Sequence, residues 1–252
     1  MRGIIPKTED TVAEEPITYG KFRFIKAESP ELKEQIYRLR YATYVEEFGF
    51  EDPRDHPGGL ETDIYDDYSI HFAALNESDE VIGTIRLILA SPHGFPIETV
   101  GPLRFVGQKP SPGKIAEISR LAVSRNYRRR REDGPYGLGS YLPLGDASTR
   151  ERKDDRRKRP IILLGLFQLM YHASKRLGLT HWYMITEDKV HCLLSKFGFV
   201  FHAIGEPVHY HGLRTPYVGI IKEMEENFAR KNPELFKKIL HGLEEKYHPK
   251  WK

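Results

Sequence analysis

The order of extended and helical segments is the feature of this sequence that most constrains its fold. Residues 70–75 (IHFAAL) and 81–90 (VIGTIRLILA) are two apolar runs joined by a short polar turn, a pattern that predicts a β-hairpin. Later in the chain, the apolar helical segment 161–177 precedes a short strand at 181–185, as in a strand–helix–strand crossover. Hairpins followed by crossovers predict a mixed β-sheet with helices on both faces, so the expected fold class is α/β.

The chain of 252 residues is long enough for one sizeable domain with appendages. We expect an N-terminal arm at 1–20, a main domain at 21–222 and a C-terminal helix at 223–252. A polar segment rich in Gly and Arg, at about 125–159, interrupts the main domain as a basic insertion. The other expected segments of the main domain are strands at 21–26, 114–123, 199–204 and 216–222, and helices at about 29–48 and 187–197.

Basic residues are concentrated in this insertion. Residues 125–159 contain twelve Lys or Arg and six Asp or Glu, a net charge of +6, whereas the whole chain carries +3. Such a local excess indicates one acidic partner surface. A loop of this kind could also bind RNA or phospholipid headgroups, or be solvated. Because it has few interleaved aromatic residues and no recognisable nucleic-acid module, no nucleic-acid partner is expected.

Cysteine usage and hydropathy favour a protein of a reducing compartment. Cys192 is the single cysteine of the sequence, so no intramolecular disulfide can form. The first residues lack the apolar core of a secretory signal, and no apolar stretch has the length of a membrane span. We therefore expect a cytoplasmic protein without a membrane span, of an oligomeric state that the sequence does not indicate.

The expected strand 114–123 carries Glu117, Ser119 and Arg120 in an otherwise apolar run. Alternation places Glu117 and Ser119 on one face and Arg120 on the other, unless a β-bulge intervenes. A carboxylate shielded on a central strand has a raised pKa, which would make Glu117 a proton acceptor near neutral pH. The alternative is a buried Glu117–Arg120 ion pair that only holds the sheet.

Other charged residues lie on predicted elements where they need partners. Arg40 and Tyr44 share one face of the first helix, where they could line a substrate entrance or form a surface cation–aromatic pair. Arg86 lies in an apolar strand, so it needs a buried counter-ion. Asp63 and Asp66 could supply it and order their loop through Arg86 and Arg40, could hold a substrate ammonium, or could belong to a solvated acidic turn.

Metal and covalent chemistry are not expected. His209 and His211 form an H-x-H pattern without a defined third ligand, so ordinary loop histidines are favoured over a metal site. Cys192 lies on an apolar helical face and is expected in the core. No G-x-S-x-G motif is present in the sequence, so a covalent acyl-enzyme is not expected.

Taken in order, these motifs resemble those of the GNAT superfamily of acyltransferases. The resemblance is closer to acyl-homoserine-lactone synthases and long-chain N-acyl amino acid synthases, and closest to the acyltransferase linked to bacterial exosortase and PEP-CTERM systems. Five motifs carry it, over roughly residues 36–125: Arg40 with Tyr44, Phe50 in place of a tryptophan, Glu61 to Asp66 (ETDIYD), Arg86 in GTIRL, and Glu117 to Arg120 (EISR). The GNAT-like pattern continues to about residue 222.

This resemblance implies a three-layer α/β/α sandwich whose central, mixed and mostly antiparallel sheet is split by a bulge. The gap would admit the pantetheine arm of an acyl thioester, and backbone N–H groups near Leu121 to Val123 would face the thioester carbonyl. One departure is that RRRREDGPYGLGS stands where acetyl-CoA enzymes of the superfamily have a short R/Q-x-x-G-x-G/A loop for the pyrophosphate. This departure favours acyl carrier protein over acetyl-CoA as the donor, with Arg128, Arg129, Arg130 and Arg131 docking the acidic carrier.

The function implied is N-acyl transfer (EC 2.3.1 class) from acyl carrier protein, or acyl-CoA, to the amine of an amino-acid-like acceptor by direct attack on the thioester. No permanently bound cofactor and no metal are expected. Alternatives are an acyl-homoserine-lactone synthase using S-adenosylmethionine, a CoA-dependent GNAT N-acetyltransferase, and a non-catalytic binding module for an acidic protein. The expected catalytic residues are Glu117, Ser119 and Arg120, and the expected substrate-binding residues are Arg40, Tyr44, Phe50, Asp63, Asp66, Arg86, Leu121 and Val123.

Overall fold

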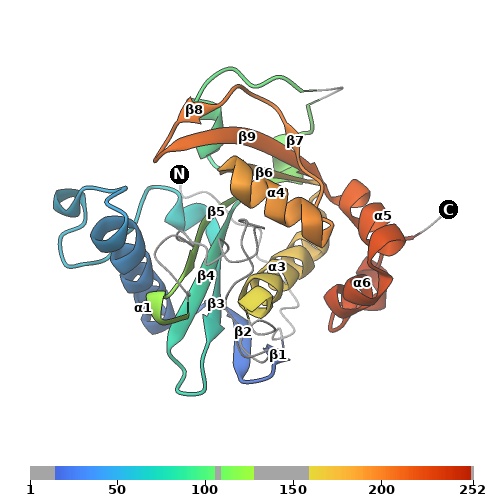
Figure 1. Ribbon diagram of the computed structural model, residues 1–252, viewed down its shortest axis with the longest axis horizontal. Coiled ribbons are helices and arrows are strands. Elements are labelled where there is room, and N and C mark those ends of the chain that lie inside the picture. Colours follow the sequence, from blue (N-terminus) through green and yellow to red (C-terminus); the bar gives the residue numbers. More distant parts are fainter. Residues whose placement is uncertain (1–14, 106–108, 128–158, 251–252) are drawn as a thin grey trace, which may run out of the picture.

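The computed structural model describes residues 15–105, 109–127 and 159–250. Within these residues, nine strands pair in the order β1-β2-β3-β4-β5-β6-β9-β7, and β8 pairs with β9 (Figure 1). All neighbouring pairs are antiparallel except β5 and β6, which are parallel. The strands are β1 (Ile17–Tyr19), β2 (Phe22–Lys26), β3 (Ser69–Leu75), β4 (Val81–Ile88), β5 (Ile115–Val123), β6 (His181–Thr186), β7 (His202–Ala203), β8 (Val208–His209) and β9 (Leu213–Ile220).

Helices cover the sheet on both faces, which confirms the predicted GNAT-like α/β fold with a mixed, mostly antiparallel sheet. The helices are α1 (Pro30–Tyr41), α3 (Arg159–Arg176), α4 (Asp188–Phe197), α5 (Ile221–Lys231) and α6 (Pro233–Leu240). Alternate residues of β3 show the two layers, because Phe72 packs in the core formed with α3, whereas Ala73 packs in a smaller core with Ile36 of α1. Figure 1 shows α1 and α3 on opposite sides of the central strands.

The first helix begins as its sequence predicts. The side chain of Ser29 accepts a hydrogen bond from the Leu32 amide at 3.2 Å, and Pro30 occupies the first turn. The helix then widens into a π-helix, η1 (Ala42–Glu47), a change that the sequence pattern did not predict. After it, the Phe50 amide donates to the Tyr44 carbonyl at 2.7 Å, which turns the chain back toward the sheet.

A bulge and a split interrupt the middle of the sheet. The register of β4 against β5 shifts between Thr84 and Arg86, opposite Arg120, which adopts a φ of +49°. On its other edge, β5 pairs with β6 only from Ile115 to Ile118, whereas β6 continues beside β9 to Thr186. The two central strands therefore diverge beyond this point, as the fold prediction required.

Three boundaries differ from those predicted. The expected arm at 1–20 includes β1, which forms a hairpin with β2, so the boundary falls inside this hairpin. The expected C-terminal helix is two helices, because Asn232 caps α6 through a hydrogen bond from the Leu235 amide and Pro233 begins the new helix. The expected strand 199–204 shortens to β7. Residues 1–14, most of the basic insertion and residues 251–252 lie outside the described residues.

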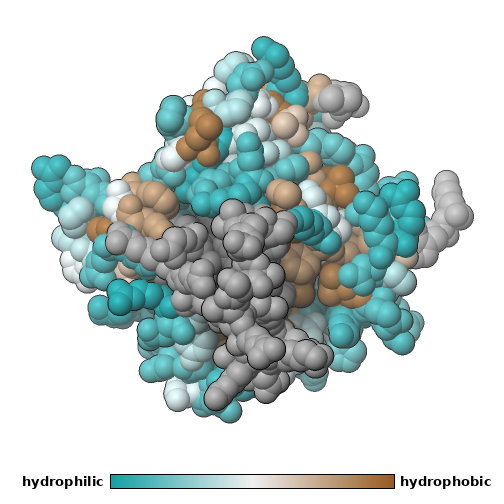
Figure 2. All heavy atoms as spheres, in the orientation of Figure 1, coloured by the Kyte–Doolittle hydropathy of each residue, from teal (hydrophilic) through white to brown (hydrophobic). Residues whose placement is uncertain are grey.

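The described surface facing the viewer in Figure 2 is mostly hydrophilic. Among the described residues, the large hydrophobic side chains that are exposed are Ile64 and Leu213. In the same ranges, no helix combines the length and the apolar character needed to cross a membrane.

Candidate active site

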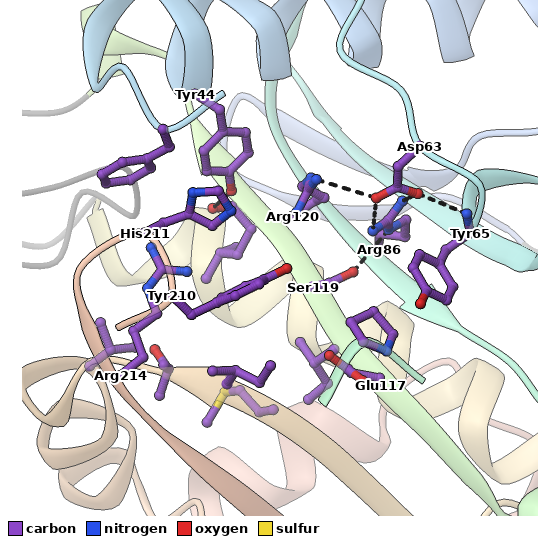
Figure 3. A pocket seen from close by; sticks show the side chains of 18 of the residues that line it. Tyr44, Asp63, Tyr65, Arg86, Glu117, Ser119, Arg120, Tyr210, His211 and Arg214 are labelled. Carbon is purple, nitrogen blue, oxygen red and sulfur yellow. Dashed lines mark hydrogen bonds and ion pairs between the residues drawn. The ribbon is translucent and has the colours of Figure 1, made fainter. Parts of the chain in front are cut away.

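A pocket opens where β5 and β6 diverge, and its empty space, open mouth included, is about 840 Å³. Figure 3 shows side chains from the segment after α1, from β4 and β5, and from the β8–β9 hairpin around this space. Of the eleven residues predicted to act in catalysis or substrate binding, eight line the pocket: Tyr44, Phe50, Asp63, Arg86, Glu117, Ser119, Arg120 and Leu121. The other three, Arg40, Asp66 and Val123, do not line it.

Glu117 is the shielded carboxylate that the sequence predicted. Its side chain is 2% exposed and accepts a hydrogen bond from the Ile97 amide at 2.9 Å. Burial raises the pKa of Glu117 to about 8, because the amide and the more distant arginines offset little of the cost of desolvating its charge. Among the described residues, Arg120 pairs with other carboxylates, so the alternative Glu117–Arg120 ion pair does not form.

Arg120 reaches the site because of the bulge. With a left-handed backbone, it departs from the simple alternation that would send its side chain to the opposite face. Its guanidinium lies 3.1 Å from Glu51, 2.9 Å from Glu61 and 3.2 Å from Asp63. This conformation costs about 1–3 kcal/mol in a non-glycine residue, and three nearby carboxylates offset that cost.

Beneath the pocket, the acidic segment 61–66 is fixed by arginines. The fully buried Arg40 holds Asp66 by two hydrogen bonds of 2.7 and 3.2 Å and also donates to Glu61. Arg86 holds Asp63 by two hydrogen bonds of 2.6 and 2.8 Å and donates to Asp66 at 2.6 Å. The predicted Arg86–Asp pair is therefore present, and Arg40 is a buried network residue rather than a surface cation.

The guanidinium groups of this network keep its buried carboxylates ionised. Burial alone would raise the pKa of Glu61, but the guanidinium groups of Arg40 and Arg120 outweigh burial and lower this pKa to about 2. Arg40 and Arg86 likewise outweigh burial at Asp66 and hold its pKa well below the ordinary range. These carboxylates stay ionised at neutral pH, and their oxygens are occupied by arginines, which favours an ordering role over binding of a substrate ammonium.

Polar groups from three elements meet at the bulge. Tyr44 donates its hydroxyl hydrogen to the Leu121 carbonyl at 2.7 Å, and the Arg120 guanidinium lies 5.6 Å from the centre of the Tyr44 ring. Ser119 accepts a hydrogen bond from Nε of Arg86 at 2.9 Å. The first helix, the bulged strand and β4 are thereby held together at the point where the ladder to β6 ends.

The β8–β9 hairpin supplies pocket residues that the sequence reasoning missed. Tyr210, His211 and Arg214 line the pocket, and the Arg214 guanidinium lies 5.5 Å from the centre of the Phe50 ring. Burial lowers the pKa of His211 even though Glu51 lies 3.5 Å away. The sequence reasoning weighed this segment only as a metal site. A cation at the start of an apolar strand was the signal that could have found Arg214.

Polarity divides the pocket into two parts. The polar part comprises Arg86 and Arg120 of the network, residues of the segment after α1, and the hairpin residues. The apolar part is continuous with the main core and consists of Ile118, Leu121, Phe167, Met184, Val190 and Leu194. Phe167 also borders a second pocket among α3, α5 and α6, whose empty space, open mouth included, is about 380 Å³.

The predicted carrier-docking residues cannot be placed, and the described residues contain no cluster of metal ligands. The docking residues Arg128, Arg129, Arg130 and Arg131 lie outside them. Within residues 15–105, 109–127 and 159–250, no three His, Cys, Asp or Glu side chains are grouped so that they could hold a metal ion.

Comparison with known proteins identifies relatives of this architecture. A family model described as an acetyltransferase (GNAT) domain matches residues 39–133. The acyl-homoserine-lactone synthase of Vibrio anguillarum is 24% identical over 172 residues, which are 68% of this chain and 75% of the relative.

Solved structures share the fold. TofI, in a ternary complex with an inhibitor and MTA, has a TM-score of 0.57 at 16% identity, over 83% of this chain and 95% of its own. The CoA-dependent acyl-homoserine lactone synthase BjaI, with MTA, has a TM-score of 0.55 at 23% identity, over 80% and 82%. FeeM, an N-acyl amino acid synthase from uncultured soil microbes, has a TM-score of 0.52 at 15% identity, over 84% and 95%.

These findings confirm the predicted resemblance to the GNAT superfamily and to acyl-homoserine-lactone synthases, and the N-acyl amino acid synthase FeeM shares the fold. The relatives are acyltransferases, which is the enzyme class that the motifs predicted. The link to exosortase and PEP-CTERM systems stays a prediction.

Proposed function

We propose that this chain is an N-acyltransferase that moves a medium or long acyl chain from a phosphopantetheine thioester to the amine of an amino-acid-like acceptor. The observation that carries this proposal is the position of Glu117, a shielded carboxylate with a raised pKa on the wall of a pocket at the split between β5 and β6. Both similarity to acyl-homoserine-lactone synthases and the GNAT-like fold support acyl transfer as the reaction class.

The proposed reaction needs no covalent enzyme intermediate. The amine nitrogen attacks the thioester carbonyl carbon and forms the C–N bond, while Glu117 takes the proton that the amine loses. The tetrahedral intermediate then collapses, the C–S bond breaks, and the proton passes to the leaving sulfur to give the free pantetheine thiol. A base with a pKa of about 8 suits this transfer, because its affinity for a proton approaches that of an amine.

Negative charge on the thioester oxygen requires hydrogen-bond donors. Beyond Ile118, β5 no longer pairs with β6, so the strand edge from Ser119 to Val123 faces the split. Tyr44 fixes this part of the strand through the Leu121 carbonyl. We assign stabilisation of the oxyanion to backbone N–H groups of this segment, and orientation of the segment to Tyr44 and Arg120.

The apolar part of the pocket suits the acyl chain. Its side chains come from the main core, and Phe167 lines both this part and the second pocket among α3, α5 and α6. An acyl group longer than acetyl would bury additional methylene groups there, each contributing about 0.8 kcal/mol. This apolar capacity favours a medium or long chain over the acetyl group of an ordinary GNAT N-acetyltransferase.

The donor is tested by kinetics with matched thioesters. Dodecanoyl-acyl carrier protein, dodecanoyl-CoA and acetyl-CoA are each supplied with a mixture of the twenty amino acids, and products are measured by mass spectrometry. We expect the highest kcat/KM with the carrier protein, because the basic insertion offers Lys and Arg to an acidic partner. Preference for acetyl-CoA would instead support the N-acetyltransferase alternative.

A second candidate, favoured by the curated relative, is synthesis of an acyl-homoserine lactone from S-adenosylmethionine. Mass spectrometry of lipid extracts from cells that overproduce the protein distinguishes the two, because one yields N-acyl amino acids and the other yields acyl lactones. If neither product forms and only binding of an acidic protein is found, the binding-module alternative replaces both enzymatic functions.

A further inference from the structure

Arg214 is a buried cation whose charge the described structure does not compensate. Its residue is 7% exposed, it lines the pocket, and its Nε and Nη2 atoms are buried without a hydrogen-bond partner among the described residues. A guanidinium has five N–H donors, and burial of such a group without a counter-ion is costly. A buried guanidinium that lines a pocket and has no anionic partner indicates that a bound ligand supplies the anion.

The other two arginines that line the pocket differ in this respect. Arg86 is held by Asp63 and Asp66, and Arg120 by Glu51, Glu61 and Asp63. The sequence reasoning considered Arg120 for binding a substrate carboxylate, but its guanidinium already has acidic partners. Of the three arginines that line the pocket, Arg214 is the one without an ion-pair partner among the described residues, and its Nε and Nη2 atoms have no hydrogen-bond partner there.

The position of Arg214 is fixed by its neighbours. It pairs with Val208 in the β8–β9 hairpin, and the next residue, Thr215, pairs with Thr186 at the end of β6. Its guanidinium packs on the Phe50 ring, at 5.5 Å from the ring centre. In the view of Figure 3, Arg214 and Glu117 lie on opposite sides of Tyr210, and all three residues line the same pocket.

The positive charge of Arg214 is separate from the charges of the buried network. The network beneath the pocket has more carboxylates than guanidinium groups: Arg40, Arg86 and Arg120 face Glu51, Glu61, Asp63 and Asp66. The network thus carries an excess negative charge, while Arg214 carries a separate positive one. The network carboxylates are held by their own arginines, so the ligand group that suits this part of the pocket is an anion that pairs with Arg214.

We infer that Arg214 binds the carboxylate of the acceptor, so that the acceptor is an amino acid rather than a simple amine. This inference rests on the proposed function and names its substrate class. A phosphate of the donor's pantetheine arm has the same anionic chemistry. We commit to the acceptor because Arg214 contacts Phe50 and lies in the polar part of the pocket, apart from the apolar acyl part.

The test compares each amino acid with its amide, which lacks the negative charge. Wild-type protein, Arg214→Gln, Arg214→Lys and the control Arg104→Gln are assayed with dodecanoyl-acyl carrier protein as donor. Arg104 is a matched control because its side chain is 79% exposed and it lies 3.9 Å from Glu206, away from the pocket lining. Thermal unfolding of each variant shows whether it is folded.

We expect wild-type protein to prefer the acid over the amide, and Arg214→Gln to raise KM for the acid by about 10- to 100-fold. The KM for the amide and for the donor should change little, and Arg214→Lys should restore part of the preference. An equal loss on acid and amide overturns the inference. A raised KM for the donor alone also overturns it, and assigns Arg214 to the phosphate.

A binding measurement separates this inference from the proposed function. Calorimetric titration with N-dodecanoyl amino acids and their N-dodecanoyl amides needs no turnover. If no donor supports acyl transfer but the acids bind more tightly than the amides in an Arg214-dependent manner, the function fails and the carboxylate site stands. If transfer occurs and acids and amides bind equally well, the function stands and the carboxylate site is refuted.

Discussion

Replacement of Glu117 by Gln tests the proposed base with little change of shape. The amide oxygen of Gln can still accept the hydrogen bond that the Ile97 amide donates at 2.9 Å. The variant cannot take a proton from the amine, so acyl transfer should fall by about 10²- to 10⁴-fold, the usual contribution of a general base. Binding of the acyl donor should persist, because the apolar part of the pocket is unchanged.

The same substitution has a predictable effect on stability. Burial raises the pKa of Glu117 from 4.5 to about 8, which corresponds to about 5 kcal/mol against its ionised form. Below pH 4.5 the group is protonated in both folded and unfolded states, and its contribution to stability is fully present. As pH rises toward 8, the unfolded state ionises first, so the wild-type protein loses this stability. Glu117→Gln does not titrate and should lose none of it.

Two measurements on the same variants check the reasoning. Urea unfolding at pH 5.5 and pH 8.5 should show Glu117→Gln gaining stability relative to wild type at the higher pH. The wild-type kcat/KM should rise with pH to a plateau, with a midpoint near 8, because only ionised Glu117 accepts a proton. Glu226→Gln is a matched control, since Glu226 is an exposed carboxylate that lies 3.9 Å from Lys222 and does not line the pocket. Activity of Glu117→Gln within tenfold of wild type, or a stability difference that is independent of pH, would refute the assignment.

Three further substitutions probe the surroundings of the base. Tyr44→Phe leaves the buried Leu121 carbonyl of β5 without its 2.7 Å hydrogen bond, so the free energy of unfolding in urea titrations should fall by about 1–3 kcal/mol. An unchanged value contradicts the role of Tyr44 in fixing this strand. Asp63→Asn releases Arg86 from one of its carboxylates, so the Arg86 guanidinium should act more strongly on Glu117 and lower the pKa of Glu117. The midpoint of the pH–activity profile should therefore move to lower pH. A shift to higher pH contradicts this prediction. Phe167→Leu replaces the ring that lines both pockets with a smaller side chain, so the acyl donor with the highest kcat/KM should be a longer one. An unchanged chain-length preference would show that the second pocket does not hold the acyl chain.

The fold was predictable because its strongest signals are local. The hairpin 70–90 and the strand–helix–strand connection after residue 160 both appear as periodic patterns, and the structure confirms them. The two-residue strands β7 and β8 are too short to show alternation, and their pairing with β9 depends on contacts distant in sequence. The break at Asn232 and Pro233 did have a local signal, a cap residue followed by Pro, although one helix was predicted there.

The candidate site was predictable where a charged residue in an apolar segment requires a partner of opposite charge. Arg86 in an apolar strand required a counter-ion, and the nearby acids supplied it. Arg120 was different, because its direction depends on a bulge and on a positive φ that strand periodicity does not reveal. Arg214 was missed because the pairing of β8 with β9, which brings it to the pocket, is too short to show as a periodic pattern.

The pocket gives chemically similar carboxylates opposite protonation states. Glu61, Asp63 and Asp66 are each close to at least one guanidinium, so their pKa values are lowered in spite of burial. Glu117 is as deeply buried, but its hydrogen-bond donor is a neutral backbone amide, and the arginines act on it only from a distance. Because the arginines are engaged by their own carboxylates, they stabilise the ionised form of Glu117 only weakly compared with the cost of its burial. The buried network thus holds the loop and the bulge in place without removing the proton affinity that the proposed base requires.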